Sequence, residues 1–100
     1  MICETEKNGS KLIIRMSGEI SASDITETEK PLLEEVEGIT NLTVDLDGLE
    51  YISSSGLRVL IRMQKRMNKQ GNMVIKNVAD EIMEVFKITG YAKYFNIVSD

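Results

Sequence analysis

Three serines followed by a glycine, Ser53 to Gly56, are the side chains of this chain best placed for chemistry. They lie between an apolar stretch and an amphipathic one, so one hydroxyl can cap a helix while the others complete a tight turn. A serine at the start of a helix can also carry a phosphate, because the unpaired N–H groups and the helix dipole favour negative charge there. An exposed hydroxyl in such a loop is within reach of a kinase. The residues alone leave the structural and the regulatory interpretations open.

A third role for these serines, as the nucleophile of an enzyme, lacks a base. The chain contains no histidine, which removes Ser-His-Asp and Cys-His triads together with imidazole metal ligands. Arg58 is close in sequence but cannot deprotonate, and a lysine would have to be buried to serve as a base. We therefore expect a protein that is not an enzyme.

Metal and cofactor sites are not expected either. Asp45, Asp47 and Glu50 are acidic side chains of the kind that binds Mg²⁺, but successive residues of a strand point to opposite faces. Only Asp45 and Asp47 share a face, so no metal site is predicted. The single cysteine, Cys3, excludes an internal disulfide and a cysteine-based zinc site, and is most simply a small residue of an edge strand.

Charge is distributed unevenly along the chain. Residues 16–57 contain ten acidic side chains and one basic one, Lys30, whereas residues 58–69 contain five basic side chains and no acidic one. On a helix, positions 58, 62, 65 and 69 share one face. This basic face is either a solvated surface or a docking surface for an acidic patch on a protein partner. The net charge of −4 argues against nucleic acid as the partner.

The length and composition describe one ordinary globular domain over residues 1–100. Of these 100 residues, 42% are hydrophobic and 28% are charged, and a chain of this length can bury a sizeable core. The N-terminus lacks the basic and apolar regions of a signal peptide, and no apolar run is long enough to cross a membrane. We expect a cytoplasmic monomer that does not bind membranes.

Apolar periodicity predicts strands alternating with helices. The expected strands are short, apolar and bounded by turn residues, and they are Ile2–Glu6, Lys11–Met16, Asn41–Asp47, Met73–Lys76 and Tyr94–Val98. Helical spacing of apolar residues recurs over residues 23–37, 54–70 and 77–89. Gly71 is predicted to end the second helix, and Asn77 to cap the third. Pro31 either kinks the first helix or marks the first turn of a shorter one.

The resulting order is β-β-α-β-α-β-α-β, an α/β fold with a mixed, mostly parallel sheet. The first hairpin adds an antiparallel edge to this sheet. Functional loops in such sheets follow the carboxyl ends of strands, which places residues 48–56 at the site. The residues expected in the core lie on the apolar faces of these elements: Ile13, Ile14, Leu42, Val44, Leu57, Leu60, Ile61, Val74, Ile75, Ile82 and Phe86.

Three blocks of the sequence resemble one known family. The segment from Leu46 to Leu60, LDGLEYISSSGLRVL, resembles the signature of the STAS family, the domain of bacterial anti-sigma factor antagonists. In that family a strand leads through a D-S-S-G-L or D-S-A-G-L loop into the second helix. Gly18-Glu19-Ile20 resembles the family's G-E-L-D, and the segment from Val85 to Tyr91 resembles its L-F-x-x-(S/T)-G-L. The resemblance covers nearly the whole chain and implies a single STAS-like domain.

What the resemblance implies for function is a binding switch. In these antagonists, the first serine of the D-S-S-G loop is phosphorylated by a partner that is both an anti-sigma factor and a serine kinase. The unphosphorylated antagonist binds that partner and frees the sigma factor, and a PP2C-type phosphatase resets it. The matching serine is Ser54, with Ser55 and Ser53 as less favoured alternatives. The expected partner-binding residues are Ser21, Ser53, Ser54, Ser55, Gly56, Arg58 and Arg62.

A second interpretation belongs to a different class of protein. Ser53 and Ser21 stand where the family has aspartate, which leaves room for a STAS module that is never phosphorylated. Such a module would serve as a scaffold or a ligand-binding part of a larger signalling assembly. Exposure to the partner and ATP distinguishes the two, because only the switch takes up phosphate.

Overall fold

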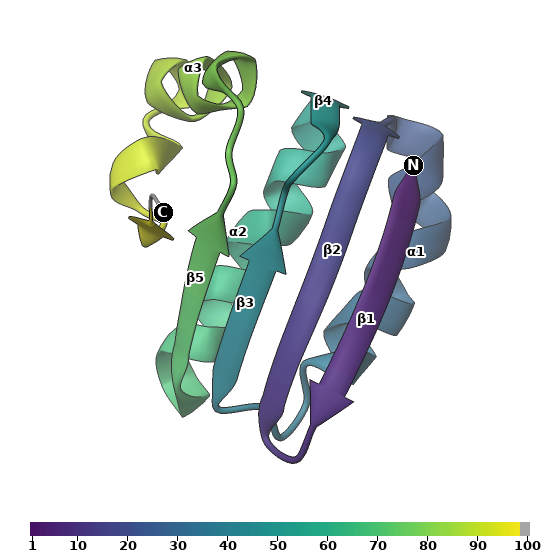
Figure 1. Ribbon diagram of the computed structural model, residues 1–100, viewed down its shortest axis with the longest axis vertical. Coiled ribbons are helices and arrows are strands. Elements are labelled where there is room, and N and C mark those ends of the chain that lie inside the picture. Colours follow the sequence, from purple (N-terminus) through teal and green to yellow (C-terminus); the bar gives the residue numbers. More distant parts are fainter. Residues whose placement is uncertain (99–100) are drawn as a thin grey trace.

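A computed structural model describes residues 1–98, which form a mixed sheet with helices on one face (Figure 1). The strands run β1-β2-β3-β5-β6 across the sheet, and β4 pairs with β2 outside this order. β1 is antiparallel to β2, and the remaining pairs are parallel. The elements are β1 (Ile2–Asn8), β2 (Lys11–Ile20), α1 (Ala22–Glu35), β3 (Asn41–Asp45), β4 (Leu49–Ile52), α2 (Ser54–Gln70), β5 (Asn72–Lys76), α3 (Asp80–Thr89), the 3₁₀ helix η1 (Tyr91–Lys93) and β6 (Ile97–Val98).

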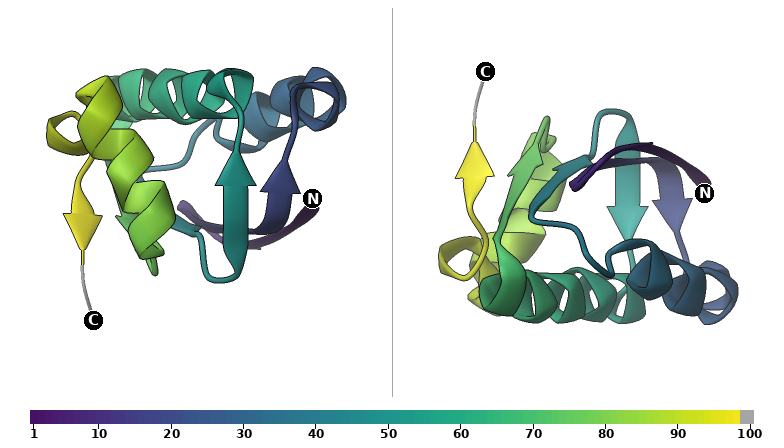
Figure 2. Two further views of the ribbon diagram at one scale, coloured as in Figure 1. Left: turned by 90° about the horizontal axis from the view of Figure 1, so that it is seen from above. Right: turned by 90° about the horizontal axis from the view of Figure 1, so that it is seen from below.

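The α/β class and the mostly parallel sheet are confirmed, and both long helices cover the same face. α1 and α2 lie behind the sheet in Figure 1 and side by side when it is viewed from above in Figure 2, with α3 across one end. Strand residues alternate between this covered face and the opposite one. Leu12, Ile14 and Met16 of β2 are therefore buried under the helices. Among the described residues, none of the helices is long and apolar enough to cross a membrane.

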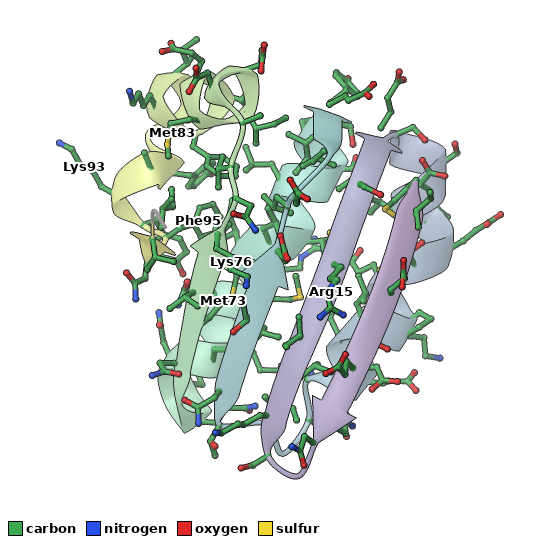
Figure 3. All side chains as sticks on the ribbon, in the orientation of Figure 1. Arg15, Met73, Lys76, Met83, Lys93 and Phe95 are labelled. Atoms are coloured by element: carbon green, nitrogen blue, oxygen red, sulfur yellow. The ribbon has the colours of Figure 1, made fainter. Side chains whose placement is uncertain are left out.

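The alternation corrects two predicted core residues. Ile13 and Val74 point away from the helices and are only partly buried, because their strand neighbours Ile14 and Ile75 occupy the covered face. The other nine predicted core residues are buried, as their apolar periodicity indicated. On the uncovered face, Arg15 and Lys76 lie in front of the strands in Figure 3.

The prediction of a loop over residues 48–56 is wrong, because it contains a strand. β4 pairs in parallel with the second half of β2, which continues past its predicted end at Met16 to Ile20. Leu49 and Ile52 are buried at the two ends of β4. β2 thus pairs with β3 over Lys11–Arg15 and with β4 over Gly18–Ile20, and the register of the β2–β4 ladder shifts between Gly18 and Glu19, which marks a β-bulge there.

The first two helices follow the prediction with small changes. α1 runs through Pro31, which is exposed, so the carbonyl that the missing N–H would have bonded can face water. α2 has the predicted bounds. Gly71 ends it as predicted, with an extended φ of 173°, and a Cβ on it would lie 2.0 Å from the carbonyl oxygen of Thr40. Close approach of the two backbones therefore requires glycine.

The end of the chain differs most from the prediction. Ala79, and not Asn77, is the N-cap of α3, while Asn77 has a φ of 58° and donates from Nδ2 to Asp45 Oδ1 at 2.9 Å. The last strand is limited to Ile97–Val98. Phe95, predicted within that strand, instead packs edge-on against Phe86 with ring centroids 5.3 Å apart. Tertiary packing of the aromatic rings outweighs the local strand preference here.

Truncation of the core should destabilise the fold strongly. Leu60 and Phe86 are 1% and 0% exposed, so replacing either with alanine leaves a cavity and should lower the free energy of unfolding by about 2–5 kcal/mol. Urea denaturation followed by circular dichroism measures this loss. Ile88→Ala is the control, since Ile88 is 82% exposed and its truncation should change stability by less than about 0.5 kcal/mol. Equal midpoints for the three variants would contradict the helix assignments.

Candidate functional site

Ser53 links β4 to α2 and uses its side chain for the fold. It is the N-cap of α2, and its Oγ accepts a hydrogen bond from the Gly56 N–H at 3.1 Å. Its own N–H donates to the carbonyl of Ile20 at 2.8 Å, which extends the pairing of β4 with β2. The residue is 9% exposed. A hydroxyl that is buried and already bonded is a poor acceptor for a modifying enzyme.

Ser54 has the opposite properties. It is the first residue of α2 and is exposed, whereas Ser55 is half-buried. The first intrahelical bond donated to Ser53 comes from the Leu57 N–H, at 2.9 Å, and the N–H groups of the opening residues of a helix have no partner within it. Of the three serines predicted as candidates, Ser54 therefore presents its hydroxyl to solvent at a fixed position beside the helix N-terminus.

Gly56 allows α2 to begin where it does. The residue is buried, and a Cβ on it would lie 2.8 Å from Ile20 Cγ2 and 3.0 Å from Ile52 Cγ1. The first distance is shorter than real Cβ atoms show, and the second is tighter than nine in ten real Cβ contacts. Glycine at this position therefore allows the first turn of α2 to pack against the ends of β2 and β4. This packing fixes the backbone position of the exposed Ser54.

Ser21 lies at the same edge as Ser53. Because Ile20 and Ile52 are paired in the parallel β2–β4 ladder, the residues after them start α1 and α2 next to one another. Ser21 caps α1: its Oγ accepts from the Asp24 N–H at 3.3 Å, and its N–H donates to Asp24 Oδ2 at 3.1 Å. Hydrogen bonds from the backbone and side chain of Ser21 lower the pKa of Asp24. The predicted partner residue Ser21 thus has a structural function.

A groove separates the starts of α1 and α2. It has a volume of about 260 Å³ and is lined by Ala22, Ile25, Thr26, Glu29, Ser55, Arg58 and Arg62. Ser55, Arg58 and Arg62 come from the predicted partner surface, so the fold brings these three together. Arg62 forms an ion pair with Glu29 across the groove. The surface here is therefore mixed in charge, with acidic side chains from α1 and basic ones from α2.

The five basic side chains of α2 divide into two groups. Arg62 pairs with Glu29, and Arg66 Nη1 donates to the Leu33 carbonyl at 3.2 Å, so both reach across to α1. Within residues 1–98, Arg58, Lys65 and Lys69 have no ion pair, and each is exposed. The helix presents these three cations to solvent.

One surface residue was missed from the sequence. Tyr51 of β4 is 52% exposed and precedes Ser54 by three residues. Exposed aromatic side chains are common anchors of protein interfaces. Tyr51 was expected in a loop, and the apolar Leu49 and Ile52 on either side of Glu50 and Tyr51 are the sequence signal for a short strand that could have revealed it.

The acidic residues near the site do not form a metal site. The described residues contain no group of three or more cysteine, aspartate or glutamate side chains arranged to hold a metal ion. Asp45 accepts hydrogen bonds from Asn77 Nδ2 and from the Asp47 N–H at 3.0 Å. Partial burial would raise the pKa of Asp45, but these hydrogen bonds outweigh it and hold the pKa below its ordinary value. This carboxylate links the ends of β3 and β5.

The arrangement presents an accessible hydroxyl beside the start of α2. Ser54 offers an exposed hydroxyl, and no histidine exists in the chain to activate it. Two helix N-termini, an exposed tyrosine and a mixed-charge groove surround it.

Comparisons with known proteins identify the family of the chain. The family model of the STAS domain matches residues 3–100. BtrV of Bordetella bronchiseptica, which is named as an anti-sigma factor antagonist, is 30% identical over 96 residues, covering 94% of this chain and 83% of BtrV. The anti-sigma-B factor antagonist of Bacillus subtilis is 24% identical over 95 residues, with 94% and 87% of the two chains covered.

Solved structures share the fold at low sequence identity. The anti-sigma factor antagonist SpoIIAA in its unphosphorylated form superposes with a TM-score of 0.86 at 14% identity, covering 99% of this chain and 88% of SpoIIAA. The family model covers nearly the whole sequence, so the chain belongs to the STAS domain family, to which two relatives named as anti-sigma factor antagonists are similar over most of their length.

Proposed function

We propose that this protein is an anti-sigma factor antagonist whose binding is switched by phosphorylation of Ser54. In its unphosphorylated form it binds an anti-sigma factor that is also a serine kinase, and so releases a sigma factor in the cytoplasm. A PP2C-type phosphatase removes the phosphate. The observation that carries the proposal is the exposure of Ser54 between two residues committed to the fold, Ser53 and Gly56.

The position of Ser54 suits a reversible modification. In the transfer, its Oγ bonds to the γ-phosphorus of ATP, the bond from that phosphorus to the ADP oxygen breaks, and the hydroxyl proton is released. The product carries roughly −1.5 to −2 charges at neutral pH. Because the helix N-terminus favours negative charge and the side chain is exposed, the fold accommodates the phosphate. A docked partner cannot accommodate the phosphate, because the phosphate occupies part of the contact surface and must lose its hydration when the partner binds.

Ser53 in place of the family's aspartate is compatible with this proposal. Serine and aspartate are both favoured N-cap residues, so either can accept the hydrogen bond from Gly56. The replacement therefore keeps the first turn of α2, and with it the position of Ser54. We assign the partner surface to the residues around that turn and the groove: Tyr51, Ser54, Ser55, Arg58 and Arg62.

The alternative is a STAS module that binds its partner constitutively. The buried, uncharged Ser53 favours it, because a kinase that reads the family's aspartate finds no carboxylate here. The two functions differ in one measurable respect, which is whether phosphate on residue 54 changes partner binding.

Substitution of Ser54 should separate the two functions. Ser54→Asp partly reproduces the charge of a phosphate and should weaken binding to the cognate anti-sigma factor by about tenfold or more, while Ser54→Ala should bind like the parent. Titration calorimetry with that partner measures both. Each variant should keep the circular dichroism spectrum of the parent. Equal affinities for Ser54→Asp and Ser54→Ala, with no phosphate found on residues 53–55, would favour the constitutive module.

Ser53 and Ser54 should respond differently to the same substitution. Ser53→Ala removes the N-cap of α2 and should lower the free energy of unfolding by about 1 kcal/mol, yet it should still take up one phosphate from the partner kinase and ATP. Ser54→Ala should keep its stability and take up none. Intact-mass measurement and urea denaturation give the two readouts. The reverse pattern would assign the acceptor to Ser53.

Arg58 should steer the partner toward the site. Arg58→Glu should slow association severalfold at low ionic strength, and the difference should shrink as salt screens the charge. Lys87→Glu makes the same charge change on an exposed residue of α3 and should leave the rate nearly unchanged. Stopped-flow measurement at two salt concentrations tests this. Equal slowing by both variants would show a general charge effect without a docking role for Arg58.

A further inference from the structure

Ser54 and Arg58 occupy positions i and i+4 of α2, and both are exposed. On a helix, side chains at this spacing are neighbours, with Cβ atoms about 5–6 Å apart. Long helical side chains also lean toward the N-terminus of their helix, so the guanidinium of Arg58 extends over the first turn. An acidic group placed N-terminal to a basic one is the more favourable order for such a pair.

The neighbouring basic side chains of α2 are already engaged. Arg62 forms an ion pair with Glu29, and Arg66 donates to the Leu33 carbonyl at 3.2 Å. Arg58 has no ion pair within residues 1–98, and it lines the groove beside Ser55. Arg58 is therefore a cation within reach of Ser54, and no carboxylate of the described residues forms an ion pair with it. Its planar fork of N–H donors matches the oxygens of a phosphate.

We propose that, in the phosphorylated protein, the guanidinium of Arg58 binds the phosphate on Ser54 within the same helix. This inference rests on the proposed function only in taking Ser54 as the acceptor. The pair gives phosphorylation two effects on the partner surface. Phosphorylation adds a bulky anion to this surface. The pair also engages Arg58, which lines the groove between the starts of the two helices and, among the described residues, forms no ion pair.

The pair is testable without a kinase or a partner. Phosphoserine is incorporated at position 54 by genetic code expansion, and ³¹P NMR follows the second ionisation of the phosphate. Because the chain has no histidine, no side chain with an ordinary pKa titrates alongside it between about pH 5 and 8. A neighbouring cation stabilises the dianion and lowers the midpoint, so its removal must raise the midpoint.

Arg58→Gln should raise the midpoint by about 0.2–0.4 of a pH unit relative to the parent phosphoprotein. Lys69→Gln is the matched control: it removes the same charge from the same helix, but roughly 22 Å along it at 1.5 Å per residue, and should leave the midpoint unchanged. In 1 M salt the difference between Arg58→Gln and the parent should largely disappear. All carboxylates are the same in the three proteins, so their influence cancels.

Two results would overturn the pair. One is an unchanged midpoint in Arg58→Gln, and the other is an equal shift in Lys69→Gln, which would reflect the general charge of the protein. Either result leaves the proposed function standing if the phosphoprotein fails to bind the cognate anti-sigma factor. Conversely, a phosphoprotein that shows the Arg58 shift but binds the partner like the parent refutes the proposed function and keeps the pair.

Discussion

The pairing of β4 with the second half of β2 is the constraint on which the site depends. Ile20 and Ile52 lie opposite one another in this ladder, and the Ser53 N–H extends it by donating to the Ile20 carbonyl at 2.8 Å. Since β2 and β4 are parallel, the segments that follow them leave the sheet at the same end, and each begins a helix there. The two N-caps, Ser21 and Ser53, follow directly. Without this pairing, the start of α2 would have no fixed position relative to α1.

The short segment after β4 divides its functions among adjacent residues. Ser53 caps the helix, Gly56 allows it to approach Ile20 and Ile52, and Leu57 is buried in the core. Ser54 alone among these four is exposed. A site of modification needs an atom that is both accessible and held in a constant position. The residues around Ser54 fix its position, and they leave its hydroxyl accessible. Phosphate added there changes the surface without breaking a contact of the core.

The acidic first helix and the basic second helix fit together at a mixed-charge boundary. The ion pair between Arg62 and Glu29 is half-exposed, and pairs of this kind contribute at most about 1 kcal/mol to stability. The main consequence of this ion pair is thus that it determines which basic side chains of α2 stay free to contact a partner protein. Arg62 is engaged with α1, whereas Arg58 stays exposed near the serines.

The sequence by itself determined α2, because its start, apolar stripe and end depend on residues close together in the chain. The same local signals indicated the parallel α/β class, and the resemblance to the STAS family indicated Ser54 as the candidate acceptor. Tertiary structure decided what distant partners control. β4 is short and exists only because β2 continues to Ile20 beside it, and Ile13 is excluded from the core because both long helices cover the other face. Which serine is buried as a cap and which is exposed likewise depends on contacts with β2, more than thirty residues earlier in the chain.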